Sequence, residues 1–253
     1  MTPQSKKSKG RAQSQPMQEQ QLPNWPAFDP LIPRMDLSIE VLVPNQVVLI
    51  RNFFTSALCK KYVSFLSTLP LVTTPGKPKK GEAVRVNDRF QIDDVSFAQR
   101  LWNETALREL VTHFGDDDDL PSVGKARDLW GGDVLGLNPN IRIYRYSKGQ
   151  FFDQHYDDSN HVTVNGNVPA KTTWTLLLYL TSPSTGCIGG ETVFYPEPAT
   201  KKKGQPIPEP IVVELETGMA LLHRHGADCM LHEGREVLEG EKWIIRSDLA
   251  VRR

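Results

Sequence analysis

The sequence of residues 140–157 reads Asn-Ile-Arg-Ile-Tyr-Arg-Tyr-Ser-Lys-Gly-Gln-Phe-Phe-Asp-Gln-His-Tyr-Asp. It contains two runs rich in β-branched and aromatic residues, 141–146 and 150–156, and a turn with Gly149 separates them. Such residues favour extended structure, and a glycine between two runs is typical of a turn. This stretch therefore predicts two consecutive β-strands.

The chain after residue 157 continues this pattern. Turn-forming Gly, Pro, Asn and Ser residues separate further short β-type runs. The runs are 172–180, 191–195, 211–215, 219–223 and 242–249, and residues 229–232 fit one more. Short strands that follow one another without helices between them predict an antiparallel sandwich or barrel.

The N-terminal half favours helices. Apolar residues recur at three- and four-residue spacing over residues 56–69, which predicts an amphipathic helix, and a second helix is predicted over residues 95–114. The loop 75–89 and the segment 90–94 after it are interpreted as a flap over a substrate. The predicted fold class is α+β, mainly β, with helices before a β-barrel-like core.

The first residues are typical of an arm. Residues 1–35 are polar and Gln-rich and then carry several prolines, so we expect a disordered or draped segment there. Residues 36–253 are expected to form a single domain, with its β-rich core over about 140–250.

The composition excludes several classes of protein. The chain has 30 basic and 30 acidic residues, so its net charge gives no reason to expect a nucleic acid or a membrane as a partner. The cysteines show no C-x-x-C pairing, and residues 1–21 lack the apolar core of a signal peptide. We therefore expect an intracellular protein, cytoplasmic or nuclear or both, that is not secreted. The oligomeric state is left open.

A histidine and a carboxylate lie on one face of the strand predicted at 150–156. His155 and Asp157 are two residues apart, so their side chains point the same way and can hold one metal ion. His232, in a later β-type run, supplies a second imidazole. Two imidazoles and one carboxylate form the facial triad of non-haem iron(II) oxygenases, which leaves positions open for a cosubstrate and dioxygen.

The third ligand has competitors in the sequence. His223 and His225 share a strand face and could bind a metal ion as a pair. We favour His232, because Lys242 follows it at a suitable interval and Gly234 opens a turn.

A cation on the last predicted strand points to an acidic ligand. Alternation puts Lys242, Ile244 and Arg246 on one face of residues 242–249. A cation inside a barrel is costly unless it meets an anion, and the far carboxylate of 2-oxoglutarate is such an anion. Tyr179 could join Lys242 at that carboxylate. Arg246 is an alternative anchor, or a contact for the primary substrate.

Several of these residues belong to longer motifs. They are Arg142-x-Tyr144-x-Tyr146-x-x-Gly149-x-Phe-x-x-x-His155-x-Asp157, Leu178-Tyr-Leu180, Gly189-Gly-Glu-Thr-Val-Phe194, Leu231-His-Glu-Gly234 and Gly240-x-Lys242-Trp243. In this order they resemble the prolyl 4-hydroxylase-type Fe(II)/2-oxoglutarate dioxygenases, over residues 140–248. The resemblance implies a double-stranded β-helix (jelly-roll) core with supporting N-terminal helices. It also implies iron(II), 2-oxoglutarate and dioxygen in the reaction, with L-ascorbate as reductant.

The resemblance assigns roles to matching positions of this chain. It implies that His155, Asp157 and His232 are the catalytic iron ligands and that Lys242 anchors 2-oxoglutarate. The other implied cofactor-binding residues are Tyr179 beside Lys242, Tyr146 beside the cosubstrate, and Thr192 as a cavity residue. Arg246, Tyr144, Asn87 and Arg89 are candidate contacts for the primary substrate.

Our first hypothesis for the function is hydroxylation of an unactivated C–H bond, on a prolyl residue of a protein or peptide, with release of succinate and carbon dioxide. Collagen is not expected as the substrate, because the sequence lacks the secretory signal and cysteine pairing of collagen-modifying enzymes. Alternatives are hydroxylation of a free amino acid or another small metabolite, and a catalytically silent jelly-roll that acts as a binding module. An open groove beside the metal would favour a peptide, and a closed lid a metabolite.

Overall fold

The computed structural model describes residues 21–74, 78, 81–115, 123–197 and 208–252. Its helices are α1 (Ser56–Leu66), α2 (Val95–Asn103), α3 (Leu107–Thr112), α4 (Val123–Trp130) and the short η1 (Arg34–Asp36), η2 (Pro183–Thr185) and η3 (Gly226–Asp228). The strands before β8 are β1 (Glu40–Val43), β2 (Val47–Ile50), β3 (Val72–Thr73), β4 (Arg85–Val86), β5 (Asp88–Asp93), β6 (Val134–Leu137) and β7 (Asn140–Ser147). The later strands are β8 (Phe151–His155), β9 (His161–Val164), β10 (Val168–Tyr179), β11 (Ile188–Gly189), β12 (Thr192–Tyr195), β13 (Ile211–Val213), β14 (Ala220–Arg224), β15 (Leu231–Gly234), β16 (Val237–Glu239) and β17 (Glu241–Arg252).

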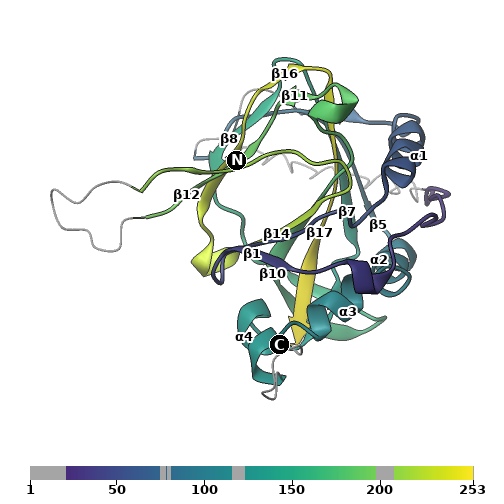
Figure 1. Cartoon of the computed structure of the whole chain (residues 1–253), viewed down its shortest axis with the longest axis vertical. Helices are drawn as coiled ribbons and strands as arrows, with labels where there is room; N and C mark the ends of the chain where they lie inside the picture. The colour runs from purple at the N-terminus through teal and green to yellow at the C-terminus, as the bar shows by residue number, and fades with distance from the viewer. Residues whose placement is uncertain (1–20, 75–77, 79–80, 116–122, 198–207, 253) are drawn as a thin grey trace, which may run out of the picture.

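The strands form two main antiparallel sheets (Figure 1). Within the described residues the larger sheet has the order β1-β2-β14-β10-β17-β7-β5-β3, and β6 and β9 pair with β17 and β10. The smaller sheet has the order β13-β12-β15-β8-β4, and β11 pairs with β16. Neighbours such as β8 and β15 are far apart in the sequence, so the chain crosses repeatedly between the sheets, as in a jelly-roll. The mainly β prediction with an antiparallel core is confirmed.

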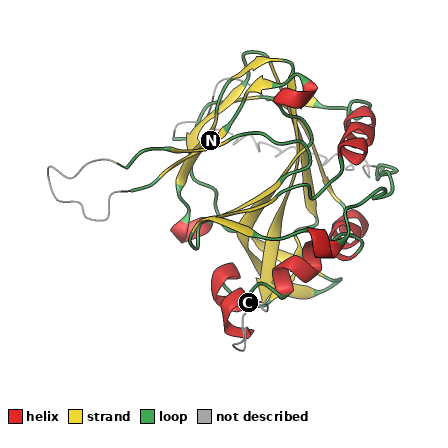
Figure 2. Cartoon of the chain, in the orientation of Figure 1, coloured by secondary structure: helices red, strands yellow, loops and turns green. Residues whose placement is uncertain are grey.

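Alternation along β17 places neighbouring side chains in the two larger apolar cores. Ile244 packs in the core between the two sheets, whereas Trp243 and Ile245 pack in the core between the larger sheet and the helices. In Figure 1 and Figure 2, α1 and α2 lie along one flank of the strands, and α3 and α4 lie at their lower end. The face of β17 that carries Lys242 and Arg246 is therefore the face between the sheets.

The helix predicted over residues 95–114 is interrupted. The structure has α2 and α3 there, with a break between Asn103 and Leu107. Thr105 lies in the break, where its hydroxyl donates a hydrogen bond to the Leu101 carbonyl at 2.6 Å and accepts one from the Leu107 amide at 3.3 Å. A threonine side chain that bonds to the backbone competes with the helical hydrogen-bond pattern. The helix therefore breaks at Thr105, although the apolar spacing continues through it.

The predicted flap is in part a strand of the larger sheet. Phe90 and Ile92 of β5 are buried and alternate with exposed residues, and β5 pairs with β7 along its whole length. The segment 90–94 therefore is not a free lid, and residues 75–77 and 79–80 of the loop lie outside the described residues.

The predicted arm is described only from residue 21. Its side chains Trp25 and Phe28 are buried in the helix-side core, and the Trp25 indole donates a hydrogen bond to Asp94 at 2.7 Å. Residues 1–20 lie outside the described residues.

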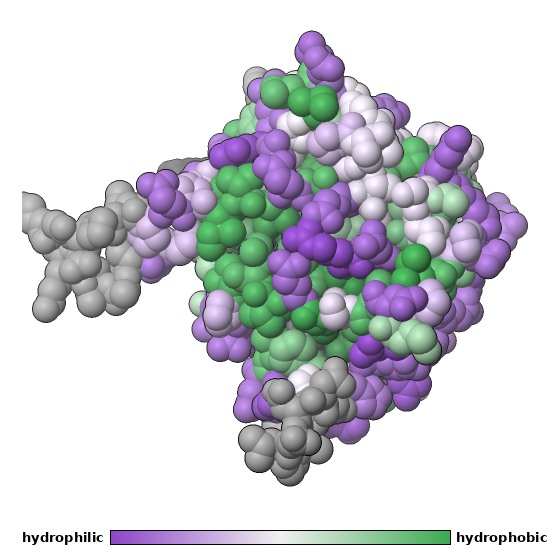
Figure 3. Space-filling view, viewed as in Figure 1, coloured by the Kyte–Doolittle hydropathy of each residue, from purple (hydrophilic) through white to green (hydrophobic). Residues whose placement is uncertain are grey.

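One face of the molecule carries an apolar area among polar side chains. Figure 3 shows this area left of the centre, where Figure 1 draws β1, β12 and β14. Val41 of β1 and Val212 of β13 are among the exposed large apolar residues. None of the described helices is long and apolar enough to cross a membrane.

Candidate metal centre

The three predicted ligands converge between the two sheets. Strands β8 and β15 pair so that His155 lies opposite His232, and their ring centroids are 4.2 Å apart. Asp157 follows the end of β8, and its two oxygens lie 3.8 Å from His155 Nε2 and 3.9 Å from His232 Nε2. One ligand atom from each residue lies within 4.8 Å of the others. Metal–ligand bonds of about 2.0–2.2 Å place ligand atoms roughly 3–4 Å apart, so these positions fit one ion.

Backbone carbonyls orient both imidazoles. His155 Nδ1 lies 2.8 Å from the Asp153 carbonyl, and His232 Nδ1 lies 2.9 Å from the Met230 carbonyl. A carbonyl only accepts, so each Nδ1 carries the proton and each Nε2 offers its lone pair toward Asp157. Burial lowers the pKa of His155 to about 3, and burial also lowers the pKa of His232. Both rings are therefore neutral near pH 7, which is the form that binds metal.

Asp157 is held as a carboxylate by its neighbours. Burial opposes its ionisation, but Arg246 and the surrounding imidazoles outweigh burial and hold the pKa of Asp157 well below its usual range. Its Oδ2 accepts hydrogen bonds from Arg246 at 2.8 Å and from the Thr175 hydroxyl at 2.9 Å. One carboxylate oxygen is thus engaged by protein donors and the other, Oδ1, is left to face His155. Two neutral imidazoles and one carboxylate are the donor set of non-haem iron(II) oxygenases.

A third histidine lies at the same centre. His223 Nε2 from β14 is 3.7 Å from Asp157 Oδ2, and its ring centroid is 4.4 Å from that of His232. His225 instead uses both ring nitrogens on the hydroxyls of Thr172 and Thr175, each at 2.9 Å. In the sequence analysis His223 was an alternative to His232 as the third ligand, whereas in the structure both imidazoles lie beside Asp157.

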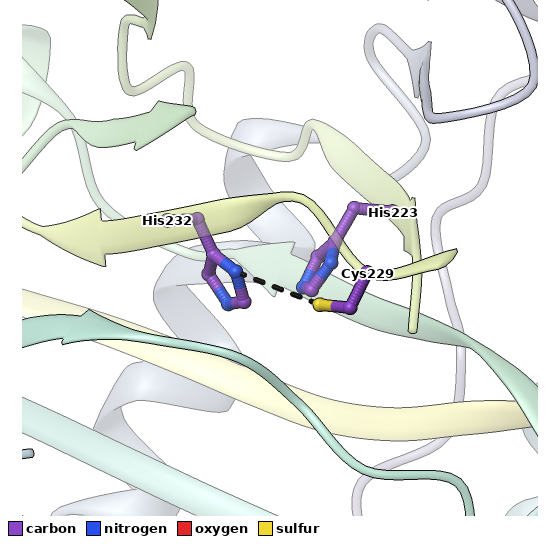
Figure 4. Close-up of side chains that lie close together, drawn as sticks. All are labelled: His223, Cys229 and His232. Atoms are coloured by element: carbon purple, nitrogen blue, oxygen red, sulfur yellow. Dashed lines mark hydrogen bonds between the residues drawn. The ribbon is translucent and has the colours of Figure 1, made fainter. Parts of the chain in front are cut away.

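A second group of metal-binding side chains overlaps with the first. His223, Cys229 and His232 also bring one ligand atom each within 4.8 Å, and Figure 4 shows them together. Cys229 Sγ lies 4.0 Å from His232 Nδ1, a nitrogen that already faces the Met230 carbonyl. Burial raises the pKa of Cys229 to about 11, so its thiol is protonated near neutral pH. Binding of a metal at this thiol would require its deprotonation, whereas His155, Asp157 and His232 are already in their metal-binding forms, so they are the better set.

Lys242 is a buried cation that forms no ion pair with a described carboxylate, and Glu191 acts on it only at longer range. It is only 3% exposed, and its ammonium donates to the Gly190 carbonyl at 2.5 Å and lies about as far from the Tyr146 ring (5.6 Å) as from the Tyr179 ring (5.5 Å). Within the described chain it forms no ion pair. Burial lowers its pKa to about 8.

Arg246 differs from Lys242 in having acidic partners. Besides Asp157, it faces Asp248, whose Oδ1 lies 3.7 Å from its Nε. Its charge is therefore already balanced, whereas that of Lys242 is not. This contrast favours Lys242 over Arg246 as the group that awaits an anion.

Most other predicted site residues line the same inner cavity. Its lining includes His155, Asp157, His232, Lys242, Arg246, Tyr144, Tyr146, Thr192 and also His223. Tyr179 stands beside Lys242, and its hydroxyl forms a 2.7 Å hydrogen bond with Thr192.

Asn87 lies away from this cavity. It is fully buried, and its backbone and side chain bond to Thr74. Arg89 lies outside the inner cavity, in two grooves described below. That either residue contacts a substrate stays a prediction.

Two outer grooves flank the predicted ligands. Each has a volume of about 790 Å³, and Arg85, Arg89, Tyr156, Asp157 and Asp158 line both. Arg85 was not identified as a site residue from the sequence. The signal that could have found it is its spacing, because residues 85, 87 and 89 lie on one face of an extended segment.

Comparisons with known proteins agree with the site. Residues 141–247 match the family model described as 2OG-Fe(II) oxygenase superfamily. No curated protein sequence matches the chain.

Solved structures with a similar arrangement include a Pseudomonas putida prolyl-4-hydroxylase, 12% identical over 82% of this chain and 94% of that chain, with a TM-score of 0.49. A Trichoplax adhaerens prolyl hydroxylase, in complex with a hypoxia inducible factor peptide fragment, is 15% identical over 83% of this chain and 85% of that chain, with a TM-score of 0.49. HygX from Streptomyces hygroscopicus, with nickel and 2-oxoglutarate bound, is 16% identical over 82% of this chain and 84% of that chain, with a TM-score of 0.46. Residues 141–247, which carry the converging ligands and Lys242, therefore belong to the 2OG-Fe(II) oxygenase superfamily.

Proposed function

We propose that this 2OG-Fe(II) oxygenase hydroxylates a prolyl residue in a protein or peptide and releases succinate and carbon dioxide. The observation that carries the oxygenase chemistry is the buried, unneutralised Lys242 on the cavity that His155, Asp157 and His232 line. The observation that favours a peptide is the pair of grooves beside Asp157. Their lining includes exposed residues such as Tyr156, so an extended chain has room to lie there.

The residues of the cavity have separate roles in holding the metal and in orienting its ligands. Iron(II) held by His155, Asp157 and His232 would supply the activation of dioxygen and the oxidative decarboxylation of 2-oxoglutarate. Arg246 and Thr175 hold Asp157 Oδ2, which fixes the direction of the remaining oxygen.

Lys242 would bind the far carboxylate of 2-oxoglutarate and so orient the keto acid. The rings of Tyr146 and Tyr179 surround its ammonium and keep water from it. The Tyr179 and Thr192 hydroxyls bond to each other and can turn toward the same carboxylate.

The test is succinate formation by the full chain with iron(II), 2-oxoglutarate and ascorbate, with and without a proline-containing peptide. We expect the peptide to stimulate succinate formation and to gain one oxygen atom on proline, as measured by mass spectrometry. Stimulation by free amino acids but not by peptides would replace the peptide with a metabolite. No turnover in any arm, with metal demonstrably bound, would contradict enzymatic function and favour a binding module.

The affinity for 2-oxoglutarate should depend on pH through Lys242. Its pKa of about 8 in the free protein means that the ammonium is present below pH 8 and is lost above it. A bound carboxylate stabilises the ammonium, so binding above pH 8 must take up a proton. We expect the dissociation constant to be flat below pH 8 and to rise by up to about tenfold per pH unit above it. Titration calorimetry between pH 6.5 and 9.5 on protein loaded with manganese(II) measures this.

The matched variant for this titration is Lys242→Arg, because a guanidinium does not titrate in this range. If Lys242→Arg still binds 2-oxoglutarate, its affinity should not fall above pH 8. An equal fall in both proteins would assign the pH dependence to another group.

Arg246 should affect metal retention more than 2-oxoglutarate binding. Arg246→Met removes the donor that holds Asp157 Oδ2, and we expect iron affinity to fall by about 10- to 100-fold, the range for partners that orient a ligand. Competition with a chelator measures it. Arg145→Met is the control, because Arg145 pairs with Asp88 and Glu241 on the same sheet and does not touch Asp157. Equal metal retention in the two variants would contradict the role of Arg246.

A further inference from the structure

Two arginines stand where the outer grooves meet. Arg85 of β4 lies opposite Phe152 of β8, and Arg89 of β5 lies opposite Tyr144 of β7. Both arginines line both grooves, and the predicted ligand Asp157 lines them too. The sheets therefore hold two guanidinium groups beside the metal centre, in the grooves that reach Asp157.

No described carboxylate neutralises either guanidinium. Among the described residues, Arg85 and Arg89 form no ion pair with a carboxylate, whereas neighbouring Arg142 pairs with Asp248. Arg85 instead stacks over the rings of Phe152 at 4.9 Å and Tyr144 at 5.7 Å. Arg89 stacks over Tyr144 at 5.9 Å and donates to the Gln91 side chain. Aromatic faces position the two cations but do not balance their charge.

Carboxylates of the groove do not supply that balance. Glu82, Asp93 and Asp158 also line the grooves, but among the described residues none of the three forms an ion pair with Arg85 or Arg89. Asp93 accepts a hydrogen bond from the Asn140 amide at 2.7 Å, and Asp158 is exposed to solvent.

The lowered pKa of Tyr144 reflects the same excess of positive charge. Burial opposes ionisation of its phenol, yet Arg246, Arg142, Arg85 and Arg89 together hold the pKa of Tyr144 below its ordinary value. Burial and the neighbouring cations also lower the pKa of Arg89. An anion placed between Arg85 and Arg89 would relieve this repulsion.

We propose that Arg85 and Arg89 form a binding subsite for an anionic group of the primary substrate, a carboxylate or a phosphate. The guanidinium fork matches both groups, because each can accept two parallel N–H donors. As a feature of substrate recognition the subsite rests on the proposed function. It adds that the oxidised carbon belongs to a substrate with a negative charge nearby, and that Arg85 and Arg89 set this specificity.

The first experiment measures anion binding directly, with inorganic pyrophosphate as the probe and titration calorimetry as the readout. Lys242→Met is the background, because it removes the cation of the neighbouring inner cavity that could also bind the probe. We expect Lys242→Met protein to bind pyrophosphate at least about tenfold more tightly than the triple variant Lys242→Met/Arg85→Met/Arg89→Met. Methionine keeps the apolar stem over the aromatic rings, and thermal unfolding checks that each variant is folded. Equal affinities in the two folded proteins would overturn the proposal.

A charge-matched control excludes a general effect of losing arginine. Arg108→Met, added to Lys242→Met, removes an exposed cation on α3, away from the grooves. It should leave pyrophosphate affinity unchanged. An equal loss with Arg108→Met would also overturn the proposal. Arg85→Lys/Arg89→Lys keeps the charge without the fork and should retain part of the affinity.

The second experiment separates the two anion sources and the two proposals. Fluorescence anisotropy with the otherwise unaltered full chain compares three proline-containing peptides that differ at one position: Asp, phosphoserine or Asn. Tighter binding of the Asp peptide identifies a carboxylate, and tighter binding of the phosphoserine peptide a phosphate. In both cases the preference should vanish in Arg85→Met/Arg89→Met.

Mass spectrometry of the same peptides then reports proline hydroxylation. Arginine-dependent anion binding without hydroxyproline would sustain the subsite and contradict prolyl hydroxylation. Hydroxylation of all three peptides at equal rates, in the native chain and in Arg85→Met/Arg89→Met, would sustain the function and overturn the subsite.

Discussion

Replacing Asp157 with alanine will abolish metal retention and succinate formation together. The change removes the one carboxylate among the converging ligands and leaves the buried Arg246 facing imidazoles without its 2.8 Å partner. We expect iron affinity to fall by more than about 100-fold, beyond the range seen when only an orienting partner is lost. Metal content after desalting and succinate formation from 2-oxoglutarate measure the two effects. His155→Ala should give the same result.

The control for this change is Asp153→Ala. Asp153 lies on β8 with His155, but its side chain is exposed, and the one hydrogen bond that it accepts from the described residues comes from the Gln154 backbone amide. It should keep both metal and turnover. Metal that survives Asp157→Ala but is lost in Cys229→Ser would instead place the ion on His223, Cys229 and His232, and the assignment of the centre would be wrong.

Replacing Lys242 with methionine will raise the 2-oxoglutarate requirement by at least about 100-fold, as expected for the loss of a charge-assisted contact inside a low-dielectric cavity. The protein should remain folded, and its melting temperature should stay level or rise, because a buried cation without an acidic partner opposes folding. The KM for 2-oxoglutarate and thermal unfolding measure the two effects. Iron retention should not change, because Lys242 does not contact the ligands.

Two further variants test whether Lys242 itself is the anchor. Lys171→Met removes an exposed lysine of β10 and should leave the KM unchanged. Arg246→Met should lower metal affinity with a smaller effect on the 2-oxoglutarate requirement. A silent Lys242→Met, together with an Arg246→Met that raises the KM, would transfer the anchor to Arg246.

Short-range patterns predicted the parts of the fold that depend on them. The strands β7, β8, β10, β14 and β17 lie within a few residues of the predicted runs, because a period of two is a local property of an extended chain. The interruption between α2 and α3 escaped prediction, because it depends on a hydrogen bond of Thr105 rather than on apolar spacing. Strands β4 and β5 also escaped prediction, because β4 has only two residues and β5 carries only Phe90 and Ile92 as apolar residues, too few to show a period of two.

The sequence by itself determined which residues could form the centre. His155 and Asp157 share a strand face, and Lys242 and Arg246 share another, because alternation needs only neighbouring residues. Only the tertiary structure decided their roles. The pairing of β8 with β15 brings His232 to His155. The packing of the sheets gives Arg246 an acidic partner, whereas Lys242, Arg85 and Arg89 form no ion pair within the described part of the chain. The charge that surrounds a side chain is set by residues distant in sequence, and long-range packing alone brings those residues together.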